Sequence, residues 1–174
     1  MHLDLTPFPE LTTPRLLLRE LSTGDVNEIF LLRSDKSVNA FVDRVKATST
    51  EDALQFINMI IAAQRDNKSV MWAIVPKGET KLIGTIVYWN IVREKDEAEV
   101  GYELLPAYHG QGIMQEALSK VIGYGFKTMK LKTIVAEPKA GNTSSVRLLE
   151  RSGFSNTGAT EGGYLIYKLE SLPL

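Results

Sequence analysis

The sequence predicts a protein of mixed α+β class, and three features indicate it. Residues 70–105 are rich in β-branched and aromatic residues and are interrupted only by short turn-like segments, which favours an antiparallel meander. On both sides of this region, apolar residues recur at intervals of three and four, as in amphipathic helices. Beyond residue 105, strand-like and helical segments alternate. The length of 174 residues suits one domain, which we expect to span residues 1–174.

The first part of the chain is expected to hold one strand and two helices. Arg15–Leu21 has the composition of a strand, and the STGD segment after it is a helix-capping signal before a helical apolar pattern. A second helix is expected to be capped by Ser49 or Thr50, because acidic residues fill the turn that follows. It should end near Asn67.

The middle of the chain is expected to form three strands. They are Val70–Pro76, Lys81–Val92 and Glu97–Leu105. In the third strand, apolar residues alternate with Glu97, Glu99 and Glu103, so one face of the strand carries carboxylates. The second strand is apolar on both faces, which favours a central position in the sheet.

The last part of the chain begins with a helix that starts at about Gly112 and has one continuous apolar stripe. The elements expected after it are a strand at Lys132–Pro138, a capped helix that begins at Asn142 and ends at Gly153, and a strand at Gly162–Glu170. The order of elements is therefore helices, an antiparallel meander, and then β-helix-β-helix-β.

Composition and charge narrow the possible functions. The chain has 20 Lys and Arg against 21 Asp and Glu, so its net charge of -1 gives no general attraction to nucleic acid or to an anionic membrane. It has no cysteine, which excludes disulfides, thiolate metal sites and a cysteine nucleophile, and no metal is expected. The N-terminal segment lacks the basic start and long apolar run of a signal peptide, so we expect a cytoplasmic protein.

A glycine pair, Gly110 and Gly112, stands directly before the third helix. It could be a tight turn, or it could let an anion approach the free N–H groups of the helix N-terminus. A dinucleotide-binding fingerprint would need a third glycine where Gln115 stands, and a P-loop would need Lys and Ser or Thr where Ile113 and Met114 stand. Both of these nucleotide motifs are therefore excluded.

Three segments in the expected order resemble the GNAT N-acetyltransferases, and in particular their ribosomal-protein (RimJ/RimL-like) branch. YHGQGIMQEAL resembles the pyrophosphate loop of that superfamily, NTSSVRLLERSGF resembles its second signature, and TTPRLLLREL resembles the start of this branch. The resemblance implies a mixed, strongly twisted sheet of about six to seven strands with about four helices. It also implies a V-shaped split between the strands at 97–105 and 132–138 that holds the pantetheine arm of acetyl-CoA.

The resemblance also implies which residues bind the coenzyme. The residues assigned to the pyrophosphate loop are Gly110, needed for the turn, and the backbone N–H groups of Gln111, Gly112, Ile113 and Met114. His109 stands where the family has Arg or Gln, and Met114 stands where it has Gly or Ala. His109 is either a neighbour of the phosphates or a solvated loop residue.

The resemblance assigns further residues to the thioester. Leu104 or Leu105 would give a backbone N–H to the thioester carbonyl, Asn142 would bind the pantetheine, and Ser145 would bind the sulfur. Many members of the superfamily use a tyrosine acid at the position of Leu149, so this acid is absent here. Asn142 could be a helix cap, a role that it could also play while it binds the pantetheine, and Ser145 could equally be an ordinary residue of the first turn.

The general base has three candidates on the two strands of the split, namely Glu99, Glu103 and Glu137. Each could take a proton directly or through water, and each could instead be a solvated or paired surface acid. The function expected from these residues is transfer of an acetyl group from acetyl-CoA directly to a primary amine, either a small molecule or the N-terminus of a peptide or protein. The alternatives are a catalytically idle CoA-binding domain and a plain interaction domain. The oligomeric state expected from the branch is a monomer or a homodimer.

Overall fold

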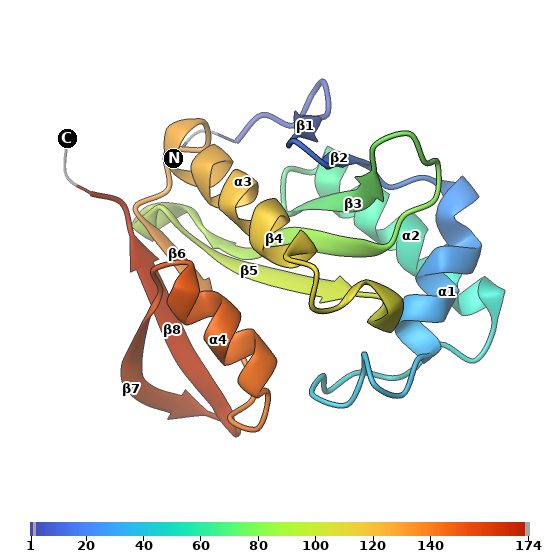
Figure 1. Ribbon diagram of the computed structural model, residues 1–174. Helices are drawn as coiled ribbons and strands as arrows, with labels where there is room; N and C mark the ends of the chain where they lie inside the picture. The colour runs from blue at the N-terminus through green and yellow to red at the C-terminus, as the bar shows by residue number, and fades with distance from the viewer. Residues whose placement is uncertain (2, 173–174) are drawn as a thin grey trace.

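The computed structural model describes residues 1 and 3–172. Among these residues eight strands form one sheet in the order β1-β2-β3-β4-β5-β6-β8-β7 (Figure 1). The strands are β1 (Leu11–Thr12), β2 (Leu16–Glu20), β3 (Val70–Pro76), β4 (Gly84–Val92), β5 (Glu97–Leu104), β6 (Thr133–Ala136), β7 (Ser155–Glu161) and β8 (Tyr164–Glu170). The helices are α1 (Val26–Ser34), α2 (Thr50–Arg65), α3 (Ile113–Lys127) and α4 (Thr143–Arg151). The α+β class and the four helices expected from the sequence are confirmed.

The sheet is antiparallel except between β5 and β6, and it divides there. β5 pairs with β4 up to Leu104, but its parallel pairing with β6 covers only three residue pairs, the last being Glu99 with Val135. Beyond that pair the two strands separate, and Figure 1 shows β5 continuing to one side while β6 and β8 run to the other. The V-shaped split that the resemblance implies is thus present at the expected strands.

The two faces of the sheet are covered by different helices. One buried cluster joins α3 and α4 to the central strands, and a second joins α1 and α2 to the opposite face. Trp72 and Tyr88 are fully buried in the first cluster, with ring centroids 6.2 Å apart in an edge-to-face arrangement. None of the helices in the described part of the chain is long and apolar enough to span a membrane.

Local signals account for most of the element boundaries. Ser49 caps α2 by accepting a hydrogen bond from the Asp52 N–H, and Asn142 caps α4 in the same way. About six to seven strands were expected from the sequence, whereas the described residues form eight. The two strands that were not expected are β1, which has only two residues, and β7, whose residues are all exposed. A polar edge strand carries no apolar alternation, so its pattern cannot be told from a loop.

Candidate active site

The glycine loop before α3 has a backbone that favours glycine at two positions. Gly110 and Gly112 both have a φ of 72°, and Gly112 is the N-cap of α3 without any side-chain cap. The side chains of Ile113 and Met114 are buried, which fixes the start of the helix against the core. Within residues 1 and 3–172, no hydrogen bond uses a backbone N–H from Gly110 to Gln115. These groups can therefore bind an anion at the positive end of the helix dipole.

Arg15 and Glu116 hold this loop in place, and the sequence analysis missed both. The Arg15 guanidinium contacts the Glu116 carboxylate through Nε at 2.6 Å and donates from Nη1 to the carbonyl of Gln111 at 2.9 Å. Thr13 donates its hydroxyl to the other Glu116 oxygen at 2.6 Å. Because these residues lie far apart in the chain, no local pattern could have joined them.

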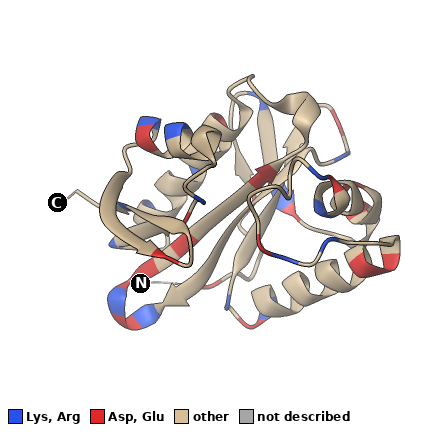
Figure 2. Cartoon of the chain, turned by 90° about the horizontal axis from the view of Figure 1, so that it is seen from below, with Lys and Arg blue, Asp and Glu red and all other residues tan. Residues whose placement is uncertain are grey.

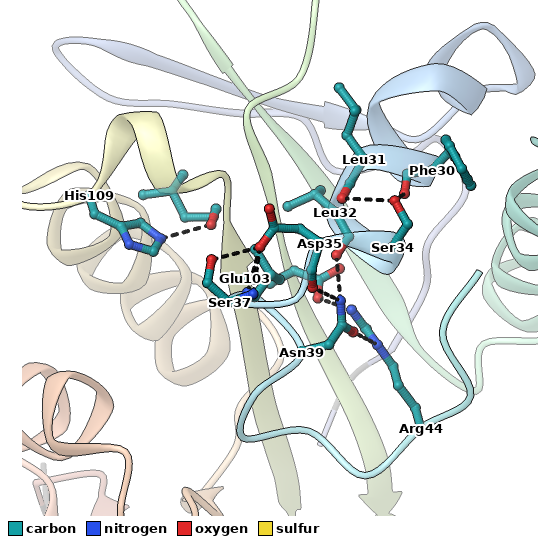
Figure 3. A network of polar contacts seen from close by, with 12 residues as sticks. Phe30, Leu31, Leu32, Ser34, Asp35, Ser37, Asn39, Arg44, Glu103 and His109 are labelled. Carbon is teal, nitrogen blue, oxygen red and sulfur yellow. Dashed lines mark hydrogen bonds and ion pairs between the residues drawn. The ribbon is translucent and has the colours of Figure 1, made fainter. Parts of the chain in front are cut away.

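His109 turns back to β5 instead of toward the glycine loop. Its Nε2 lies 2.8 Å from the carbonyl oxygen of Leu104, the last residue of β5 (Figure 3). The imidazole therefore links the end of the strand to the segment that leads into α3. Of the two roles that the sequence left open for His109, this contact favours neither, because the ring nitrogen is engaged by the chain itself.

The amides of Leu104 and Leu105 point to opposite sides of β5. Leu105 N–H donates to the carbonyl of Ile83 at 2.8 Å and is thus committed to the β4 side. Backbone groups alternate along a strand, so the N–H of Leu104 points to the side of the split. Leu104 lies beyond the last β5–β6 pair, and among the described residues no strand pairs with it on that side. The geometry favours Leu104 over Leu105 as a donor inside the split.

Asn142 and Ser145 lie at the start of α4, on the other side of the split. The Asn142 side chain accepts a hydrogen bond from the backbone N–H of Ser145 at 3.2 Å, as a helix cap does. The Ser145 hydroxyl lies 2.7 Å from the phenolic oxygen of Tyr102, which belongs to β5. Leu149 is fully buried in the core, so its apolar side chain cannot supply an acid to the split.

Glu99 is the carboxylate at the point where β5 and β6 separate. The Asn90 side chain donates a hydrogen bond of 2.7 Å to the Glu99 carboxylate. In the sheet, Glu99 pairs with Trp89 of β4, which is an exposed residue. Burial raises the pKa of Glu99 to about 7, and the negative charge of Glu137 adds to the rise, while hydrogen bonding from Asn90 and Trp89 opposes it. A carboxylate that titrates near neutral pH can accept a proton and release it again.

Glu103 lies on the same face of β5 but is held in an ion pair. Its carboxylate lies 2.6 Å from Nη2 of Arg44, and the two side chains are only 12% and 19% exposed. Arg44 also donates from Nε to Asn39, a buried side chain that donates to the carbonyls of Leu32 and Asp35 at the end of α1 (Figure 3). The carboxylate is thus a fixed counter-ion for Arg44.

The segment between α1 and α2 also reaches the far arm of the split. Asp43 binds Nζ of Lys139 at 2.6 Å and accepts a hydrogen bond from the Tyr164 hydroxyl at 2.9 Å. The hydrogen bond to Asp43 raises the pKa of Lys139, so this side chain stays charged. Together with the Arg44–Glu103 pair, these contacts join residues 43 and 44 to both sides of the split. We call residues 35–48 the strap.

The electrostatic character of the molecule is mixed. Figure 2 shows acidic and basic residues intermixed along the visible elements, in keeping with the net charge of -1. The recognition of a charged ligand therefore depends on the local groups just described.

Comparison with known proteins identifies the family. The acetyltransferase (GNAT) domain matches residues 15–155, and the chain therefore belongs to the GNAT family of N-acetyltransferases. It is 33% identical over 151 residues, which are 87% of this chain and 85% of the relative, to the uncharacterized N-acetyltransferase YoaA of Bacillus subtilis (strain 168). It is 29% identical over 111 residues, or 63% of this chain and 57% of the relative, to the ribosomal protein uS5-alanine N-acetyltransferase of Escherichia coli (strain K12). The similarity to the RimJ/RimL-like branch is thus confirmed.

The fold is also found in a solved structure with bound coenzyme. The structure of RimL, a ribosomal L7/L12 alpha-N-protein acetyltransferase in complex with coenzyme A, superposes with a TM-score of 0.81. The alignment covers 93% of this chain and 98% of that chain, at 19% identity. At this identity the comparison shows that the two chains share a fold.

Proposed function

We propose that this acetyltransferase moves an acetyl group from acetyl-CoA directly to a primary amine. One observation carries the proposal: the sheet splits between β5 and β6 next to a helix N-terminus whose glycine loop has free N–H groups. The split can take an extended chain such as pantetheine, and the loop can take a pyrophosphate. The bound coenzyme seen in the RimL structure supports this assignment by shared fold.

The residues of the glycine loop fit a coenzyme pyrophosphate. The backbone N–H groups of Gln111, Gly112, Ile113 and Met114 would bind its oxygens, and Gly110 gives the turn its left-handed backbone. This binding depends on the main chain, so the atypical side chain of Met114 is no obstacle. When bound, acetyl-CoA supplies an activated thioester.

The chain's own groups then act on the thioester from two sides. The Leu104 N–H points into the split and would stabilise the negative charge that develops on the carbonyl oxygen. Ser145 would hold a proton for the departing sulfur, and its Asn142 cap would bind the pantetheine amide. With no cysteine available as a nucleophile, direct transfer within a ternary complex is the simplest route.

We assign the general base to Glu99 among the three carboxylates considered. Its pKa of about 7 lets it accept a proton from the attacking amine near neutral pH. Glu103 is engaged by Arg44 and serves to hold the strap. Glu137, whose charge acts on Glu99, would help to attract the cationic amine.

The acceptor we propose is the N-terminal amine of a peptide or protein. The E. coli relative is named for acetylating an alanine of ribosomal protein uS5, and RimL for acetylating L7/L12. An unprotonated α-amino group is more common near neutral pH than an unprotonated lysine, because its pKa is about 7.7–8.0. A base that titrates near 7 suits such an amine.

The proposal is tested by following thiol release from acetyl-CoA with peptides that have free N-termini and with small primary amines. Acetylated peptide formed in step with free CoA is the expected result, and peptides blocked at the N-terminus serve as the control. At a hundredfold excess over Kd, bound acetyl-CoA stabilises the folded protein by about 2.7 kcal/mol, which gives a large thermal shift. Such a shift without turnover of any acceptor would point to the idle CoA-binding alternative. The absence of any thermal shift would show that the protein does not bind acetyl-CoA.

A further inference from the structure

One contact across the split has no part in the mechanism described so far. The Tyr102 phenol reaches from β5 to the Ser145 hydroxyl on α4, at an oxygen–oxygen distance of 2.7 Å. Tyr102 lies beyond Glu99, the last β5 residue paired with β6, so the hydrogen bond joins the two arms where the strands have already separated. It is therefore a contact between two hydroxyl groups within the proposed coenzyme site.

The chemistry of this pair follows from the number of protons on it. Each hydroxyl can donate one hydrogen bond and accept two. If Tyr102 donates to the Ser145 oxygen, the proton of Ser145 is free to point at another acceptor, and the donated bond makes that proton a better donor. Burial raises the pKa of Tyr102 to about 12, so the phenol keeps its proton at the pH values at which an enzyme works.

We propose that Tyr102 supplies the proton for the departing CoA sulfur. Tyr102 is a positioning residue, and its proton reaches the sulfur by relay through Ser145. The inference rests on the proposed function. As the carbon–sulfur bond breaks and its electron pair stays on sulfur, the Ser145 proton moves to the sulfur, and the Tyr102 proton moves to the Ser145 oxygen. The Tyr102 phenolate then takes a proton from water. Glu99 gives to the solvent the one proton that it took from the amine, and this replaces the proton taken by the phenolate, so the protons balance.

The apolar residue Leu149 explains why a proton relay from another element would be needed. A side chain that is fully buried and apolar cannot deliver a proton to the split, and it stands where the sequence resemblance places a tyrosine acid in many members of the superfamily. A phenol from β5 that reaches the same end of α4 restores the missing acid from the opposite arm. Ser145 alone is a weak acid, and the hydrogen bond from Tyr102 is what would make it an effective one.

The test compares Tyr102→Phe, Ser145→Ala and the double variant with Tyr167→Phe. Tyr167 on β8 also binds α4, through a hydrogen bond of 3.1 Å to Glu150, so its variant loses a similar strand-to-helix contact outside the split. Tyr102→Phe is expected to lower kcat by about tenfold to a hundredfold, at or below the lower end of the range of about 10² to 10⁴ for general acid catalysis, because Ser145 keeps its own hydroxyl proton. The double variant should be no slower than Ser145→Ala, because the two hydroxyls act in series. Tyr167→Phe should keep the wild-type kcat.

A second readout is independent of turnover. The pKa of the CoA thiol bound to the protein can be measured from the pH dependence of CoA affinity by calorimetry, with acetyl-CoA, which has no ionisable thiol, as the reference ligand. The relay predicts a bound thiol pKa that rises in Tyr102→Phe and Ser145→Ala, because the thiolate loses its hydrogen-bond donor.

A purely structural contact gives a different result. Tyr102→Phe would then lower stability and raise KM for acetyl-CoA, with an unchanged kcat and an unchanged thiol pKa, and this outcome would overturn the relay. Failure of the proposed function is distinguishable, since the wild type itself would then transfer no acetyl group while the thiol titration could still be read.

Discussion

Glu99→Gln is the substitution that tests the base most sharply. The glutamine side chain has the size of glutamate and keeps an oxygen that can accept the 2.7 Å hydrogen bond from Asn90. It cannot take a proton from the amine. General base catalysis contributes about 10²- to 10⁴-fold, so kcat/KM at about pH 8 is expected to fall by that factor.

The pH dependence of kcat/KM gives a second test of Glu99 as the base. With a pKa of about 7, Glu99 is ionised in about nine tenths of the molecules at pH 8 and in about one tenth at pH 6. The wild-type plot of log kcat/KM against pH should therefore bend near pH 7, and the bend should be absent in Glu99→Gln. The assay is thiol release with a peptide N-terminus as the acceptor. The titration of its α-amino group, with a pKa of about 7.7–8.0, is the same for the wild type and for Glu99→Gln, so only the bend that Glu99 causes is lost.

Stability must change in the matching direction. The pKa of Glu99 in the folded chain, about 7, lies above its ordinary value of 4.5, so its favourable contribution is complete below pH 4.5 and is lost as the pH rises through 7. Glu99→Gln should thus remove part of the fall in unfolding free energy between about pH 5 and about pH 8, as followed by urea unfolding. Glu97→Gln is the matched control, because this residue lies on the same face of β5 but pairs with Lys168. A bend near pH 7 in the plot of log kcat/KM that persists in Glu99→Gln would refute the assignment of Glu99 as the base.

The contacts of the glycine loop and of Glu103 lead to three further expectations. Gly112→Asp should abolish acetyl-CoA binding in calorimetry, because like charges about 4 Å apart at an effective dielectric constant of about 20 repel by about 4 kcal/mol. Gly112→Asn is the uncharged control, and wild-type affinity in a folded Gly112→Asp variant would contradict the loop assignment. Arg15→Ala should weaken acetyl-CoA binding by about tenfold at unchanged kcat, since the loop loses a charge-assisted hydrogen bond, and a fall in kcat at saturating acetyl-CoA would count against it. Arg44→Ala should lower the unfolding free energy by about 2 kcal/mol, because it leaves Glu103 largely buried without its partner. The exposed Lys81→Ala should stay within about 0.5 kcal/mol, and similar losses in urea unfolding would show that the Arg44 pair has no special weight.

The sequence could predict the elements whose signals are local. Ser49, Asn142 and the glycines before α3 are recognised by the hydrogen bonds and dihedral angles that helix ends require, and the structure places them at those ends. The strands of the meander could be predicted from their β-branched and aromatic residues and from the turn-like segments between them, with alternation adding to this in the third strand. β7 could not, since none of its residues is buried.

The site depends more on contacts between distant segments, and these carry no local signal. Arg15 meets Gln111 across 96 positions, and Arg44 meets Glu103 across 59. The spacing of carboxylates on β5 could nominate Glu99 and Glu103 equally. Only the fold separates them, because it gives one an arginine partner and leaves the other half-buried beside a second acid.

Direct transfer of the acetyl group in the split can be followed by rapid quenching of the protein with acetyl-labelled acetyl-CoA. Without an acceptor, we expect that no label becomes bound to the protein at any time. With a peptide N-terminus present, label should pass to the peptide in the first turnover without a lag. A labelled protein that forms at the rate of turnover and then donates its acetyl group to the peptide would contradict the account.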